Sequence, residues 1–84
     1  MKRKDEEEEI IKWIKRFEEE EKEVQRELVR LRQILFYFRD LLKDEEKEML
    51  LSKIRIYKKT DIWIKKRKEK YLKVLQYLRI SKVI

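Results

Sequence analysis

The sequence predicts an all-α protein in which two long helices fold back on each other as an antiparallel hairpin. The chain of 84 residues contains no Gly and no Pro, and these are the residues on which the turns of β-rich folds depend. Charged residues make up 51% of it, which suits long solvated helices. Apolar residues recur at alternating spacings of four and three along both halves, as in a coiled-coil seam.

The first predicted helix runs from about residue 5 to about residue 43. Asp5 can cap its N-terminus, and the carboxylates of residues 6–9 favour the positive end of the helix dipole. Residues 1–4 are expected to form a frayed basic arm. The seam has one polar member, Glu21, in an otherwise apolar row: Ile10, Ile14, Phe17, Val24, Leu28, Leu31, Leu35, Phe38 and Leu42.

The second predicted helix runs from about residue 45 to about residue 81, with Asp44 as its N-cap. Its seam contains Leu50, Ile54, Tyr57, Asp61, Ile64, Lys68, Tyr71, Leu75, Leu78 and Lys82. A continuous helix is the favoured interpretation, and two alternatives stay open. Thr60-Asp61 is a good N-cap pair, at which the helix can break. Residues 53–66 can also be read as a β-hairpin, similar to the wing of winged-helix DNA-binding domains.

The charges favour an antiparallel arrangement of the two helices. With the turn near residues 44–46, the acidic run 18–23 lies opposite the basic run 65–70. Glu21 then comes close to Lys68, so the two polar seam residues are predicted to form a pair that sets the register. The alternative is that both side chains extend to the edge of the seam and stay hydrated.

A second apolar surface remains after the seams are paired. Exposed apolar surfaces of this size usually mark an interface, so the single domain of residues 1–84 is expected to form a homodimer, a four-helix bundle of two hairpins. The residues expected at this dimer or partner interface are Trp13, Ile34, Leu41, Ile56, Trp63, Val74 and Tyr77.

The composition argues against catalysis. The chain has no His and no Cys, which removes the commonest general base, the commonest nucleophile-activating group and the thiolate metal ligands. Glu18 and Glu21 have helical spacing, but di-iron bundles also require a Glu-x-x-His motif. We therefore expect no enzyme activity, no metal site and no cofactor.

The net charge of +7 is concentrated in the second half, where residues 49–84 carry twelve Lys and Arg against two Asp and Glu. Such a cluster can neutralise phosphates, and interleaved aromatic residues can stack on bases. We expect DNA or RNA to be bound by shape and charge. The architecture resembles small dimeric helical hairpins that bind RNA through one face, although no motif supports kinship. The candidate contacts are Arg26, Arg30, Arg32, Arg55, Lys58, Lys59, Lys65 and Lys66.

A different function remains open, in which the second helix is basic only because the first is acidic. The protein would then be an adaptor that binds another protein, such as an antitoxin-like or viral anti-defence accessory protein. No signal peptide or membrane span is recognised, so a cytoplasmic location is expected and a membrane partner is not. The abundance of Lys and Glu and the lack of Asn and Cys are typical of thermophiles, which suggests an archaeal or viral source.

Overall fold

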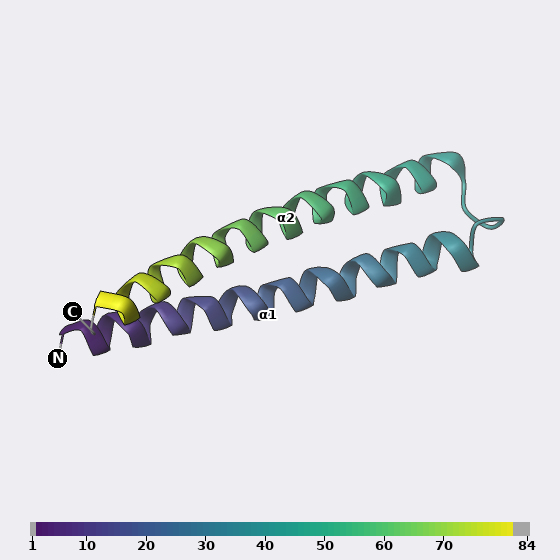
Figure 1. The fold of residues 1–84 in the computed structure, drawn as a ribbon. Coiled ribbons are helices and arrows are strands. Elements are labelled where there is room, and N and C mark those ends of the chain that lie inside the picture. Colours follow the sequence, from purple (N-terminus) through teal and green to yellow (C-terminus); the bar gives the residue numbers. More distant parts are fainter. Residues whose placement is uncertain (1, 82–84) are drawn as a thin grey trace.

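The computed structural model describes residues 2–81 and shows a helical hairpin. Helix α1 spans Lys2–Tyr37 and helix α2 spans Asp44–Ser81. The start of α1 and the end of α2 lie together at the open end, and the turn lies at the other end (Figure 1). The hairpin measures 63 × 14 × 14 Å. The predicted all-α antiparallel hairpin is confirmed.

The core is a single row of side chains between the two helices. Phe17, Tyr71 and Trp13 form an aromatic cluster toward the open end, where the ring centroid of Tyr71 lies 5.3 Å from that of Phe17 and 6.4 Å from that of Trp13. Each fully buried apolar side chain contributes about 1.5–3 kcal/mol. Within the described residues the buried apolar side chains all belong to the two seams: Ile14, Phe17, Val24, Leu28, Leu31, Ile54, Ile64 and Leu75.

The first helix ends earlier than predicted, at Tyr37 instead of about residue 43. Residues 38–43 form the connection, in which the Phe38 N–H donates to the Ile34 carbonyl and the Leu42 N–H donates to the Phe38 carbonyl. The apolar repeat continues into this turn through Phe38 and Leu42, so the repeat does not mark the end of the helix.

The second helix is capped by Glu46 and not by the side chain of Asp44. The Lys43 carbonyl accepts the first helical hydrogen bond, from the Lys47 N–H, so Lys43 occupies the N-cap position. The Glu46 carboxylate reaches back to the Lys43 N–H at 3.1 Å, as the glutamate of a capping box does. Asp44 therefore belongs to the first turn, where its charge still suits the helix dipole.

Helix α2 is continuous across Thr60 and Asp61. The Thr60 hydroxyl donates to the Ile56 carbonyl at 3.0 Å, a bond typical of a threonine inside a helix and not at an N-cap. Asp61 is buried against α1 instead of starting a new helix. The broken-helix alternative is wrong, and residues 53–66 are helical, so the β-wing alternative is wrong as well.

The N-terminal boundary also differs from the expectation. Helix α1 begins at Lys2, so Asp5 lies in its first turn and does not cap it. The backbone of residues 2–4, which belong to the expected basic arm, is included in the helix, and Met1 lies outside the described residues.

Candidate nucleic-acid interface

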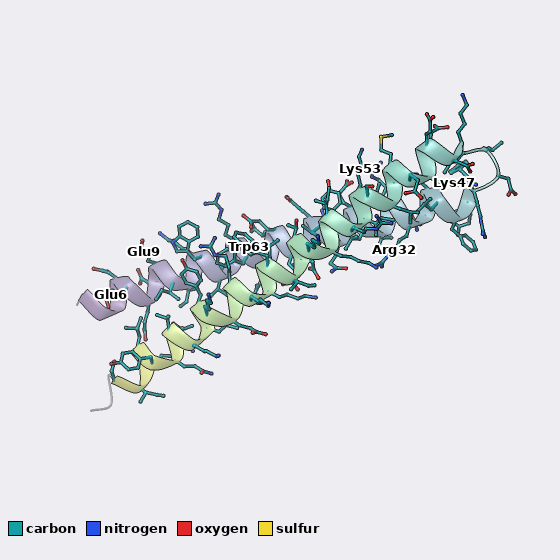
Figure 2. The ribbon with its side chains drawn as sticks, turned by 90° about the horizontal axis from the view of Figure 1, so that it is seen from above. Glu6, Glu9, Arg32, Lys47, Lys53 and Trp63 are labelled. Atoms are coloured by element: carbon teal, nitrogen blue, oxygen red, sulfur yellow. The ribbon has the colours of Figure 1, made fainter. Side chains whose placement is uncertain are left out.

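The hairpin has two side faces of different chemistry, one on each flank of the core. In an antiparallel helix pair, the same heptad flank of each helix comes to the same side. Figure 2 shows Arg32 on one side of the hairpin, and Lys53 and Trp63 on the other. We call the first side the basic face, and its cations are Lys15, Lys22, Arg32, Arg39, Arg55, Lys58, Lys65 and Arg79, with Lys47 at its edge. It also carries the carboxylates Glu8, Glu18, Glu48 and Glu69 and the exposed apolar residues Val29, Phe36, Leu51, Ile62 and Leu72. The second is the apolar face, and its apolar residues are Trp13, Ile34, Tyr37, Met49, Ile56, Trp63, Val74 and Tyr77.

A groove of about 540 Å³ lies on the basic face close to the turn, and we call it the basic groove. Four cations line it, together with an apolar floor; the full lining is Arg32, Leu35, Phe36, Arg39, Lys47, Leu51, Ile54 and Lys58. No carboxylate lines the groove. Phe36 is 77% exposed at its edge. The groove therefore combines positive charge with an aromatic surface.

The cations of the basic groove are free to bind an external anion. Among the described residues, the ion pairs of the hairpin involve Arg16, Arg30, Lys65 and Lys68, and none involves Arg32, Arg39, Lys47 or Lys58. Figure 2 shows Arg32 and Lys47 toward the turn, whereas Glu6 and Glu9 lie near the open end. Acidic residues 6–9 are thus far from the groove along the hairpin.

Two of the predicted contacts, Arg26 and Arg30, lie outside the basic groove. They line a second groove of about 650 Å³, whose lining also contains Glu18 and Glu21. Arg30 is bound to Glu27, with Nη2 2.8 Å from Oε2. This hydrogen bond raises the pKa of Arg30 and lowers that of Glu27. These neighbouring carboxylates make the second groove less suited to a polyanion.

The remaining predicted contacts are spread along α2. Arg55 and Lys58 lie on the basic face close to the turn, whereas the exposed Lys59 and Lys66 lie on the side of α2 that points away from α1. Lys65 binds Asp61, with Nζ 3.0 Å from Oδ2. The structure therefore brings together Arg32 and Lys58 of the predicted set and adds Arg39 and Lys47.

The predicted register pair is close in space, in a cluster of ionic side chains beside the core. Lys68 Nζ lies 3.8 Å from Glu21 Oε2 and 3.8 Å from Glu18 Oε1. At these distances the charged groups form ion pairs, but they are too far apart to form hydrogen bonds. The side chains of Lys68 and Glu21 are 27% and 24% exposed, so the pair is half-buried at the edge of the core.

Asp61 is the buried polar residue of this cluster, and its residue exposure is 8%. Burial raises its pKa, but hydrogen bonds from Lys65 and Gln25 and the charge of Lys65 outweigh that effect, so the pKa lies below its ordinary value of 3.8. The same hydrogen bond raises the pKa of Lys65. Oδ2 of Asp61 is paired with Lys65, and its Oδ1 is buried without a hydrogen-bond partner among the described residues, so Asp61 is a charged residue held at the edge of the core.

The residues predicted for a dimer interface are largely exposed in the hairpin. On α2, Ile56, Trp63 and Tyr77 are 62%, 53% and 70% exposed. Val74 and Trp13 are also exposed, Ile34 is half-buried, and Leu41 lies exposed in the turn. All except Leu41 belong to the apolar face.

Fold and charge together define a small helical hairpin with a basic groove on one face and apolar residues on the other. Comparison with known proteins finds no family model, no curated protein and no solved structure that matches the chain. Over the described residues, neither helix is long and apolar enough to cross a membrane. The same residues contain no group of three or more Asp or Glu placed to hold a metal ion.

Arg39 and Lys47 were not among the predicted contacts. The first helix was expected to continue to about residue 43. Arg39 would then have been a residue within that helix, closer to the turn than the cluster of predicted contacts. The signal that could have identified them is their position on either side of the turn that joins α1 to α2. Cations that flank a turn converge when the two helices pack.

Proposed function

We propose that this protein binds nucleic acid without catalysis, by holding the phosphate backbone in the basic groove. The observation that carries the proposal is the lining of the groove, with four unpaired cations and no carboxylate. Neutralised phosphates release condensed counterions, and this release is the main driving force of charge-directed binding. The lack of His and Cys further supports a binding function over an enzymatic one.

Phe36 supports binding to nucleic acid that has unpaired bases. Its ring is 77% exposed beside the cations, so it can stack on a base without giving up packing contacts in the core. Stacking of one base on an aromatic side chain contributes about 1–3 kcal/mol. Phosphates held by Arg32 and Lys58 would position an adjacent base against the ring.

We propose that the binding unit is a homodimer, a four-helix bundle of two hairpins. The support is the thin core and the exposed apolar face, which includes Ile56, Trp63 and Tyr77. A single layer of two helices cannot cover these side chains. A second hairpin would cover them, and it would double the number of basic grooves.

A second candidate function is that of a protein-binding adaptor. The observation that favours it is the pairing of Lys68 with Glu18 and Glu21, because here a positive charge of α2 is neutralised by negative charges of α1. In that case the apolar face would bind a different protein. This candidate does not explain the four cations near the turn, which form no ion pair within the described hairpin.

Fluorescence anisotropy with labelled oligonucleotides tests the proposal. Single-stranded and duplex DNA and RNA are titrated with the protein over a series of salt concentrations. Four phosphate contacts predict that the logarithm of the affinity falls linearly with the logarithm of the salt concentration, with a slope of about −3 for a single strand. The absence of binding to any of these probes at ~50 mM salt would overturn the proposal.

A further inference from the structure

The apolar face carries a second heptad row on α2. Met49, Ile56, Trp63 and Tyr77 lie on one heptad position, which Lys70 interrupts between the last two, and Val74 lies on the same face beside Tyr77. All five are exposed, from 45% for Val74 to 70% for Tyr77. A row at this spacing runs straight along a coiled-coil helix and is suited to packing against another helix.

The size of the face fits a second copy of the chain. The hairpin is 63 Å long and 14 Å wide. A face of these dimensions can bury the roughly 800 Å² per partner that stable protein interfaces bury. The core of one hairpin is only one layer thick, and small domains of this kind gain stability by association.

The charges on the apolar face are separated between the two helices. On α2 the face carries three cations, Lys53, Arg67 and Lys70, and one carboxylate, Glu46, which accepts a hydrogen bond from the Lys43 N–H. On α1 it carries two cations, Arg16 and Arg30, and five carboxylates, namely Glu6, Glu9, Glu20, Glu23 and Glu27. The α1 half of the face is therefore acidic and the α2 half is basic.

We propose that two hairpins associate through their apolar faces with α1 of each chain over α2 of the other and with both turns at the same end. A two-fold axis along the hairpin produces this arrangement and keeps each residue at its own level along the bundle. Acidic α1 surface then meets basic α2 surface. The alternative two-fold axis, across the hairpin, puts α1 on α1 and places the turns at opposite ends. It would bring the middle of the acidic α1 surface, with Glu20 and Glu23, against the same surface of the other copy, and like charges in contact are costly.

Apolar contacts agree with the same orientation. Trp13 stacks on Tyr71 within the hairpin. Along the hairpin axis, Trp13 therefore lies close to the part of α2 that contains Val74 and Tyr77. In the proposed dimer, Trp13 of one chain therefore packs near Val74 and Tyr77 of the other. Toward the turn, Ile34 and Tyr37 of one chain come close to Met49 of the other.

The ion pairs already present within α1 do not oppose this arrangement. Arg16 binds Glu20 at 3.6 Å and Arg30 binds Glu27 at 2.8 Å. These side chains are between 39% and 65% exposed, and exposed pairs of this kind contribute little. Glu23 lies between them, without an ion pair in the described hairpin, and is available to Arg67 of a second copy. The proposal extends the dimer proposed above, and it places both basic grooves at one end of the bundle, on opposite outer faces.

Spin-label distances test the orientation, and the lack of any Cys makes single-site labelling straightforward. Labels are attached to an Asp40→Cys variant in the turn. The proposal predicts a distance no greater than the combined width of two hairpins, each 14 Å across. A distance close to the hairpin length of 63 Å would overturn the orientation but leave the dimer intact. A monomer at micromolar concentration would overturn both, and neither result depends on nucleic-acid binding.

A matched pair of substitutions tests the surface itself. Ile56→Glu places a charge on the apolar face, whereas Ile62→Glu places the same charge on the opposite flank of α2; the two residues are 62% and 54% exposed. We expect Ile56→Glu to weaken dimerisation at least tenfold and Ile62→Glu to leave it unchanged, as measured by analytical ultracentrifugation. Equal effects of the two substitutions would contradict the assignment of the face. Circular dichroism controls for unfolding.

Discussion

Lys68 of α2 lies 3.8 Å from Glu21 of α1, and both are polar members of otherwise largely apolar seams. The ammonium group is equally close to Glu18, one turn earlier on α1. A charged pair at the edge of a seam has its best-established role in setting register, and not in adding net stability. The pair therefore ties a particular level of α1 to a particular level of α2.

Exchange of the two charges tests this coupling. Glu21→Lys and Lys68→Glu each place like charges together, and the double variant restores an opposite pair. Since both side chains are about one quarter exposed, we expect a coupling free energy of about 0.5–1 kcal/mol in a double-mutant cycle of urea unfolding. In the double variant Glu18 remains close to the glutamate introduced at position 68. Repulsion between these two carboxylates makes the recovery of stability partial. Strictly additive effects of the two single changes would show that the residues are not coupled.

Asp61 predicts a dependence of stability on acid pH. Its pKa is lower in the folded chain than the ordinary 3.8, so the charged carboxylate stabilises the fold above that pH. This contribution is lost as the pH falls through the folded pKa. Asp61→Asn is expected to lower the free energy of unfolding by about 1 kcal/mol at neutral pH, and the difference from the wild type should shrink below pH 3.8. Urea unfolding measures both; a difference that does not change with pH would contradict the interpretation.

The capping interaction of Glu46 predicts a local effect on α2. Glu46→Ala removes the acceptor of the Lys43 N–H and should lower the free energy of unfolding by about 0.5–1 kcal/mol. Glu45→Ala is the matched control, because it removes the same charge from the same turn without removing this bond. Thermal unfolding followed by circular dichroism compares the two. If both variants lose the same stability, the helix dipole alone explains the effect.

The fold was predictable from the sequence because the seams are long, but their ends were not. Phe38 and Leu42 continue the apolar repeat beyond the end of α1, so periodicity hides the turn. Thr60 has the side chain of an N-cap residue, yet its hydroxyl bonds to the carbonyl of Ile56 inside a helix. Such local choices depend on tertiary packing, in this case the burial of Asp61 against α1.

The candidate site was only partly predictable for a related reason. Arg32 and Lys58 were identified from the density of charge along the chain. Arg39 and Lys47 depend on where the turn lies, and charge density does not reveal that Arg30 is bound to Glu27. Which cations share a groove is decided by the packing of the two helices and not by their spacing in sequence.

Phe36 distinguishes unpaired from paired nucleic acid. If its exposed ring stacks on a base, Phe36→Leu should weaken binding to a single strand by about tenfold, which corresponds to the lower part of the 1–3 kcal/mol range for one stacked base. Binding to a duplex, whose bases are already stacked, should change little. Phe38→Leu is the matched control, because Phe38 is also exposed near the turn but does not line the basic groove. An equal loss for single-stranded and duplex probes would argue against stacking.

The central claim is that four particular cations, and not the net charge of +7, bind nucleic acid. Two variants that lose the same charge test it most directly. One replaces the groove cations Arg32, Arg39, Lys47 and Lys58 by Gln, and the other replaces the exposed and distant Lys12, Lys15, Lys73 and Arg79 by Gln. In anisotropy titrations with a single-stranded probe, the groove variant should lose roughly 100-fold in affinity and most of its salt dependence, and the distant variant should lose much less. Equal losses in the two variants would contradict the account.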